Sequence, residues 1–314
     1  MLKFIFYRVV SLTPLCVLIV LIAFALLQLI PGDPAVVMLG VDATPERLVA
    51  MRERLGLDRP LIEQFLAYLA GVATGDLGRS TFLNQDVLSA IGARLPVSLL
   101  LAAMSLFWAV LLGIPAGVWA AARRGSLIDR TVMLSSLIGM SIPSFWLGLI
   151  MIMMIGVWLG LLPTGGYVSP FDNPWEAFTH LLLPSLSLGF IQMAQVARMT
   201  RSAMLEVLRQ DYILVAHAKG VSEFTILFSH ALRNGMTGIL TVIALIFAEI
   251  LGGALVTEQI FSLPGLGQLI ITAVGYRDYP VIQGSLVVLG ISYVIINALT
   301  DVGYGVIDPR VREK

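Results

Sequence analysis

The sequence has few charged residues for its length. Asp, Glu, Lys and Arg make up 13% of its 314 residues, and hydrophobic residues make up 58%. A soluble domain carries about 25% charged and about 45–50% apolar residues. This deficit excludes an ordinary water-facing surface, because only a bilayer solvates so much apolar area. The composition therefore predicts an integral membrane protein, in agreement with a mean hydropathy of +0.90.

Cysteine, histidine and net positive charge are also scarce. Cys16 is the single cysteine, which excludes an internal disulfide and a thiolate metal site. The formal net charge is zero, which argues against a nucleic-acid partner. His180, His217 and His230 fall at or outside the predicted membrane surfaces, in separate segments. They therefore predict no metal site and no Ser–His pair of an intramembrane protease.

A nucleotide-binding motif is missing as well. The three lysines are Lys3, Lys219 and Lys314, and none stands in the Gly-x4-Gly-Lys-Ser/Thr pattern that cradles phosphates. We therefore expect that this chain is not an enzyme, has no catalytic residues and binds no cofactor.

Long apolar runs predict an all-α fold with about six transmembrane helices, since a helix needs about 20 apolar residues to cross the hydrocarbon core. The first run precedes no small-x-small cleavage site, so it is expected to be an uncleaved span. Pro115, Pro143 and Pro184 lie inside spans or at their edges and predict kinks. The predicted spans are Val9–Ile30, Val97–Ala122, Val132–Trp158, His180–Ala197, Met236–Thr257 and Val281–Val302.

The distribution of Lys and Arg predicts the orientation. With the N-terminus inside, most basic residues fall in inner segments, and the outer loop 159–179 holds none. Both termini are therefore expected in the cytoplasm. The expected domains are the N-terminal end with the first span (1–30), an external domain (31–96) and a transmembrane core (97–314) with a cytoplasmic loop (198–234).

The cytoplasmic loop has signals for a short helix. Tyr212, Val215 and Ala216 can share one helical face, Gly220 is a C-terminal stop, and Ser222 is an N-cap for the next helix. These patterns alone allow either a membrane-surface connector or a helix that docks on a partner.

A few polar residues lie within the predicted spans. Glu249 falls near the middle of the fifth span, where a charge is expensive and usually functional. It either lines a translocation pathway, is a protonated structural residue buried within the chain, or pairs with an arginine of another subunit. Gln192, Gln195 and Asn297 are weaker pathway candidates, because hydrogen bonds between helices, worth about 0.6 kcal/mol, also explain them.

Several motifs, taken together, resemble one family. Tyr212-x3-Ala216-x-Ala218-Lys219-Gly220, followed by His230-Ala-Leu-Arg-Asn234, is similar to the cytoplasmic loop of binding-protein-dependent ABC importer permeases in its peptide-importer form. The dipeptide, oligopeptide, nickel and glutathione permeases share further stretches, in the same order. These are Leu29-Ile-Pro-Gly-Asp-Pro34, Leu55-Gly-Leu-Asp-Arg-Pro60, Gly75-Asp-Leu-Gly78, Glu258-Gln-Ile-Phe-Ser-Leu-Pro-Gly-Leu-Gly267 and Arg277-Asp-Tyr-Pro280.

The resemblance implies a type I ABC importer permease fold in the cytoplasmic (inner) membrane. It implies a second homologous permease, two ATP-binding subunits that use ATP and Mg, an external substrate-binding protein and a peptide-like cargo. The loop helix would sit in a groove of an ATPase, with Lys219 or Asp211 as its polar contact. The residues implied for this coupling are Asp211, Tyr212, Ala216, Ala218, Lys219 and Gly220. The candidate contacts of the binding protein are Glu46, Arg47, Arg52, Arg277 and Asp278.

Two alternatives stay open from the sequence. An ion-coupled secondary transporter is favoured by Glu249 and the internal prolines, but no inverted repeat is evident. Within the ABC class, glutathione or a nickel chelate could replace a di- or oligopeptide as cargo.

Overall fold

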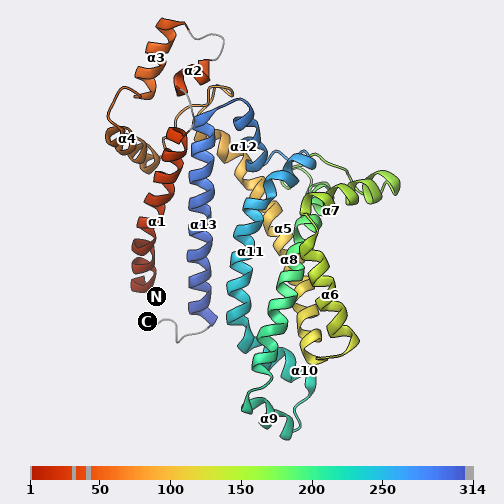
Figure 1. Cartoon of the computed structure of the whole chain (residues 1–314). Coiled ribbons are helices and arrows are strands. Elements are labelled where there is room, and N and C mark those ends of the chain that lie inside the picture. The colour runs from red at the N-terminus through yellow and green to blue at the C-terminus, as the bar shows by residue number, and fades with distance from the viewer. Residues whose placement is uncertain (1, 30–32, 40–43, 308–314) are drawn as a thin grey trace. The chain divides into compact units, whose positions relative to one another are not determined.

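The computed structural model describes residues 2–29, 33–39 and 44–307 (Figure 1). In these ranges every regular element is helical, and the only β pairing is an isolated bridge between Arg79 and Asp86. Five helices are long and apolar enough to span a membrane, and a bent helix pair raises the number to six. The predicted all-α membrane fold is confirmed.

The chain divides into two compact units. Unit 1 comprises Met1–Val97 and Gly265–Ile295, and unit 2 comprises Ser98–Pro264 and Ile296–Lys314. Helices α5 and α13 contribute to both units. The elements in chain order are α1 (Leu2–Leu29), α2 (Pro34–Leu39), α3 (Pro45–Leu55), α4 (Leu61–Thr74), α5 (Val87–Ala122), α6 (Leu127–Ser141), α7 (Ser144–Met151), the π-helical η2 (Ile152–Trp158), α8 (Pro174–Val207), α9 (Asp211–Ala218), α10 (Glu223–Thr225), the π-helical η3 (Ile226–Ala231), α11 (Leu232–Ile260), α12 (Leu266–Gly275) and α13 (Tyr279–Ile307).

In unit 1, helix α4 packs on the first span. The ring of Phe24 meets the rings of Phe65 and Tyr68 at centroid distances of 5.6 and 6.1 Å. Val20 and Val287 are buried beneath this contact, so α1, α4 and α13 share an apolar core. The predicted external segment 31–96 therefore lies in the same unit as the first span and most of the last one.

In unit 2, helix α8 packs against α6, α7 and α11. It also approaches α5 closely at glycines. A Cβ atom added to Gly117 would lie 2.5 Å from the Ala197 carbonyl oxygen, and one added to Gly113 would lie 2.8 Å from that of Met193. Gly113 and Gly117 form the Gly-x3-Gly spacing that lets membrane helices touch through their backbones.

The third predicted span, Val132–Trp158, is wrong as a single helix. The structure breaks it into α6 and α7–η2, whose axes are bent by 97°. The break falls at Pro143, which lacks an N–H and restricts the preceding residue. Ile142 is accordingly extended, with φ −89° and ψ 124°. By contrast, Pro115 and Pro184 lie inside the unbroken helices α5 and α8.

Candidate functional site

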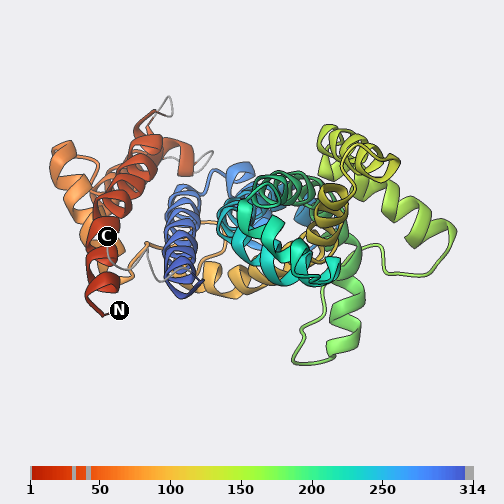
Figure 2. The same cartoon turned by 90° about the horizontal axis from the view of Figure 1, so that it is seen from below.

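The short helix α9 lies at one end of unit 2 (Figures 1 and 2). It ends as the sequence predicts, because Gly220 has φ +72°, a conformation that costs other residues strain. The Gly220 and Val221 amides donate to the carbonyl oxygens of His217 and Ala216, at 2.9 and 3.2 Å. These two hydrogen bonds satisfy the last carbonyl groups of α9, and the chain changes direction at Gly220.

The N-cap at Ser222 is also confirmed. Its Oγ accepts a hydrogen bond from the Thr225 amide at 3.3 Å, which starts α10. Helix α10 continues through η3 into α11, and together they form one apolar span of 38 residues. The segment after α9 is therefore continuous with a membrane helix.

Helix α9 is held to unit 2 by one side of its surface. Ile213 is only 1% exposed, and α9 packs against η3. Beneath the loop, Val118, Met204 and Ala231 form a buried cluster from α5, α8 and η3. Because α9 packs on η3, and Ala231 of η3 belongs to this cluster, a displacement of α9 would be passed through η3 to α5 and α8.

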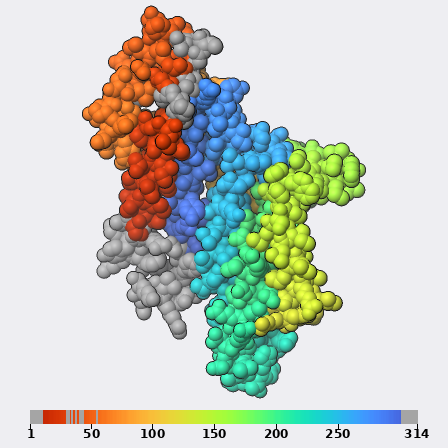
Figure 3. Space-filling view, in the orientation of Figure 1, coloured from red at the N-terminus to blue at the C-terminus, as the bar shows by residue number. Residues whose placement is uncertain are grey.

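Helix α9 protrudes at the lower end of the view in Figure 3, and its opposite side is exposed and apolar. Leu214 and Val215 are 64% and 52% exposed, and Phe224, which follows on α10, is 71% exposed. Tyr212 is exposed as well, so it shares an open surface with Val215, whereas Ala216 is half-buried. Large apolar side chains gathered at the tip of a domain are typical of an interaction surface. The polar candidates Asp211 and Lys219, with Ala218, are exposed at the two ends of α9.

One contact in this site could not be read from the sequence. The Asn234 Nδ2 donates to the Tyr212 hydroxyl at 2.8 Å and also lies 2.9 Å from the His230 carbonyl oxygen. Both residues belong to motifs of the family resemblance, but their spacing of 22 residues gives no signal that they meet. The bond ties the start of α9 to the start of α11.

A second missed feature is an ion pair near the same end of unit 2. Arg201 of α8 holds Asp129 of α6 through two hydrogen bonds, Nε to Oδ1 at 2.5 Å and a terminal guanidinium nitrogen to Oδ2 at 2.8 Å. The Gly125 amide also donates to Asp129, at 2.9 Å. The only sequence signal was an acidic residue beside one span and a basic residue at the end of another.

Helix α11 presents an uncovered face in unit 2. Glu249 is exposed on it, which contradicts the interpretation of Glu249 as an acid buried within this chain. A Cβ atom added at Gly252 or Gly253 would meet no other atom within 4 Å. The exposed positions follow a helical repeat of three and four residues. They are Gly238, Thr241, Leu245, Glu249, Gly252 and Val256.

The other pathway candidates lie differently. Gln192 is 6% exposed, and its side-chain oxygen is buried without a hydrogen-bond partner, so it faces the packed interior of unit 2. Gln195 and Asn297 are half-buried. Burial makes Gln192 a poor lining residue for a pathway open to solutes.

The candidate contacts of a binding protein belong to unit 1. Glu46 and Arg47 are exposed on α3, whereas Arg52 pairs with Asp33 at 2.7 Å. Arg277 is exposed in a left-handed conformation, with φ +55°.

Asp278 is the exception among these candidates, because only 1% of it is exposed. Its Oδ2 accepts hydrogen bonds from the Ser80 hydroxyl at 2.5 Å and the Phe82 amide at 3.0 Å. Burial contradicts a direct partner contact for this carboxylate. It instead fixes the loop whose Phe82 ring stacks on Tyr276, at a centroid distance of 3.6 Å.

Comparison with known proteins places the chain in a family. Residues 113–313 match the model for the inner membrane component of binding-protein-dependent transport systems, and residues 1–102 match the model for the N-terminal part of that membrane component. A Brucella abortus (strain 2308) protein, named as a permease of a peptide transport system, is 44% identical over 97% of both chains. The dipeptide transport system permease protein DppB of Escherichia coli (strain K12) is 40% identical over the whole of both.

A solved structure shares the fold. The MetNI methionine ABC transporter, in an inward-facing conformation, aligns with a TM-score of 0.58 and 22% identity over 70% of this chain and 97% of that one. The two family models together cover nearly the whole sequence. The chain belongs to the family of inner membrane components of binding-protein-dependent transport systems.

Proposed function

We propose that this chain is a permease subunit of an ATP-driven importer that moves di- or oligopeptides inward across the cytoplasmic membrane by alternating access. Relatives named for peptide and dipeptide transport support the cargo class. A second, homologous permease, two ATPases that use ATP and Mg, and an external binding protein complete the complex. Both termini lie in the cytoplasm.

The observation that carries the proposal is the two-sided character of α9. Its inner side is anchored by the buried Ile213, and its outer side exposes Leu214, Val215 and Tyr212. An exposed apolar face with an aromatic residue suits docking into a groove of an ATPase. Asp211 and Lys219 supply the polar contacts, and Gly220 fixes the angle at which α9 is held. Rigid-body motion of the ATPase then reaches α5, α8 and η3 through the anchored side.

The uncovered face of α11 is proposed to line the pathway. A face turned to lipid would carry large apolar side chains throughout, but this one places Thr241, Glu249 and Gly252 among its two large apolar residues, Leu245 and Val256. Glu249 would attract the ammonium group of a peptide, and the glycines leave room for side chains of varied size. Gln195 and Asn297 stay secondary candidates.

The external surface of unit 1 is proposed to receive the binding protein. Glu46, Arg47 and Arg277 are exposed there as direct contacts. Arg52 acts through its ion pair with Asp33, and Asp278 acts by holding the exposed Phe82 ring in place.

The test is ATP turnover by the reconstituted complex with and without a dipeptide-loaded binding protein. A β-branched residue is strained at φ +72°, whereas Asn tolerates this conformation, and a Cβ at Gly220 meets no neighbour. Gly220→Val should therefore abolish the stimulation by cargo, and Gly220→Asn should retain most of it.

Two other outcomes would contradict parts of the proposal. Stimulation that survives Gly220→Val in a fully assembled complex would disprove the coupling role of α9. Absence of stimulation by any dipeptide or oligopeptide in the wild-type complex would disprove the cargo class, and glutathione and nickel chelates would then be tried.

A further inference from the structure

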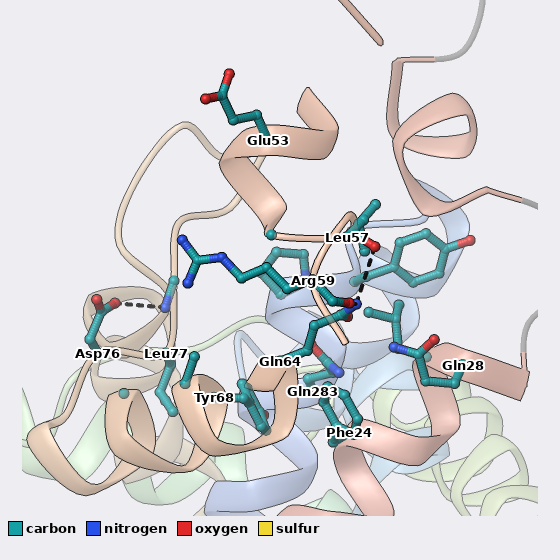
Figure 4. Close-up of a pocket in the computed structure, with 17 residues that line it drawn as sticks. Phe24, Gln28, Glu53, Leu57, Arg59, Gln64, Tyr68, Asp76, Leu77 and Gln283 are labelled. Atoms are coloured by element: carbon teal, nitrogen blue, oxygen red, sulfur yellow. Dashed lines mark hydrogen bonds between the residues drawn. The ribbon is translucent and has the colours of Figure 1, made fainter. Parts of the chain in front are cut away.

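Unit 1 contains a cavity of about 360 Å³ that the transport cycle proposed above does not use (Figure 4). It lies where the C-terminal end of α1 meets the N-terminal end of α13, under the segment that joins α3 to α4. Both spans reach a membrane surface at these ends, since α1 spans from Ser11 to Leu29 and α13 from Tyr279. The cavity therefore lies at the edge of the hydrocarbon region.

The upper part of the cavity is polar and charged. Gln64 shapes it, because its Nε2 donates to the carbonyl oxygens of Leu57 and Arg59 at 3.2 and 2.8 Å. The Arg59 guanidinium has no ion-pair partner among the described residues and extends toward the side on which Asp76 lies. The Gly78 amide donates to Asp76 Oδ1 at 2.9 Å, which fixes this carboxylate at the rim. Glu53 points away from the cavity.

The floor of the cavity is aromatic. Figure 4 shows Phe24 and Tyr68 side by side below Gln283. Burial raises the pKa of Tyr68 to about 12, so the phenol stays neutral at physiological pH. Its hydroxyl oxygen is buried and has no hydrogen-bond partner. It is thus a donor at the bottom of the cavity that none of the described residues satisfies.

The cavity adjoins a shallow apolar groove, with a volume of about 30 Å³, between the two spans. Leu27, Tyr279 and Gln283 line both spaces. The groove continues along Ala23, Leu26, Ile282 and Leu286, toward the middle of α1 and α13, and Leu26 is 43% exposed at its edge. A polar chamber at the membrane edge thus lies beside a shallow apolar groove, and the two share lining residues.

We propose that this cavity binds a phospholipid whose headgroup carries both a phosphate and a primary ammonium, the phosphatidylethanolamine type. Arg59 binds the phosphate, Asp76 binds the ammonium, and an acyl chain follows the groove between α1 and α13. The shallow groove beside the chamber, with Leu26 exposed at its edge, favours a lipid over a soluble zwitterion, because an acyl chain can cover this apolar surface and a soluble ligand gains nothing from it. By the orientation proposed above, the lipid belongs to the outer leaflet. Because α1 has few other packed neighbours, with only 11% of its span window buried, the lipid would hold α1 to α13.

The test measures lipid retention by the purified importer complex. After mild detergent extraction, mass spectrometry should find phosphatidylethanolamine retained in a fixed ratio. Arg59→Gln removes a charge-assisted contact and should lower retention about tenfold. Ala67→Trp fills the cavity from an exposed position on α4 and should lower it similarly. Arg47→Gln, an exposed arginine outside the cavity, should retain lipid as the wild type does.

A second arm distinguishes the ligands. Phosphatidylethanolamine added to the delipidated complex should raise its unfolding temperature more than phosphatidylglycerol does, and soluble phosphoethanolamine should have no effect. Equal retention in the wild type, Arg59→Gln and Ala67→Trp would overturn the site. Equal stabilisation by phosphatidylglycerol would overturn recognition of the ammonium, and stabilisation by phosphoethanolamine alone would overturn the lipid assignment. Because retention is measured without ATP or cargo, these outcomes are independent of the coupling test.

Discussion

Glu249 has an unusual setting for a carboxylate in a membrane helix. It lies in the middle of α11 on a face that no described part of unit 2 covers, between Leu245 and Gly252. An ionised carboxylate facing lipid costs several kcal/mol, so this face is stable only against water, cargo or a second subunit. Because the side chain is exposed, its substitution should affect transport directly.

We expect Glu249→Gln to lower dipeptide uptake about tenfold, since it removes one charge-assisted hydrogen bond to a peptide ammonium. The measurement is uptake of a labelled dipeptide into proteoliposomes with ATP inside. Glu63→Gln removes an exposed carboxylate on α4, outside the long spans, and is the matched control that should change uptake little. Unchanged uptake by Glu249→Gln would assign the residue to pairing with the partner permease or to no role in transport.

The contact between Tyr212 and Asn234 gives a second prediction for single residues. Tyr212→Phe removes the hydroxyl that accepts from Asn234, and an exposed hydrogen bond of this kind contributes about 0.5–1.5 kcal/mol. We expect cargo-stimulated ATP turnover to fall about threefold, and the same for Asn234→Ala. The double variant should be no worse than either single variant, because both remove one interaction. Additive losses would show that the two side chains act separately.

For whole helices, the close approach of α5 and α8 is the most demanding contact in unit 2. A side chain at Gly117 would overlap the Ala197 carbonyl oxygen and the Thr200 Cβ atom, at 2.5 and 2.6 Å. Both are held by the backbone of α8, so neither can move aside.

Gly117→Val should therefore destabilise the complex by about 1–3 kcal/mol or more, as overpacking does. The measurement is the unfolding temperature in detergent. Gly92→Ala on the same helix is a matched control, because a Cβ there meets nothing within 4 Å, and the helix propensity of alanine should leave stability equal or higher. A Gly117→Val complex as stable as the wild type would show that α5 and α8 can separate without loss.

The sequence predicts elements better than it predicts their contacts. Apolar runs located the spans, and Gly220 and Ser222 located both limits of the loop after α9, because these signals are local. The bend at Pro143 was underestimated as a kink, since the amount of bending depends on what packs around it. The burial of Asp278 and its bonds to residues about 200 positions earlier have no local signal.

For the whole molecule, the orientation in the membrane is the property on which the proposed function depends. The native chain has the single cysteine Cys16, so a Cys16→Ser background permits labelling at one chosen position. In intact spheroplasts, an impermeant maleimide should label Thr81→Cys, which is exposed in unit 1 outside the spans. It should label Arg209→Cys, exposed between α8 and α9, only after permeabilisation. The reverse pattern would overturn the inward direction of transport.

Gly220 and Ser222, which follow α9 and fix where it ends and where the next helix begins, have a consequence for engineering. Gly220 and Ser222 fix the end of α9 locally, Ile213 anchors its inner side and Tyr212 is held by Asn234, so the other exposed positions of residues 211–219 can be exchanged as one segment. Splicing the outer residues of another importer's loop into this frame, with Ile213 retained, should redirect the permease to that importer's ATPases. Co-purification with the donor's ATPases would measure the exchange. In such a permease, the residues of α9 would determine which ATPases it binds, and other parts of the chain would determine which cargo it transports.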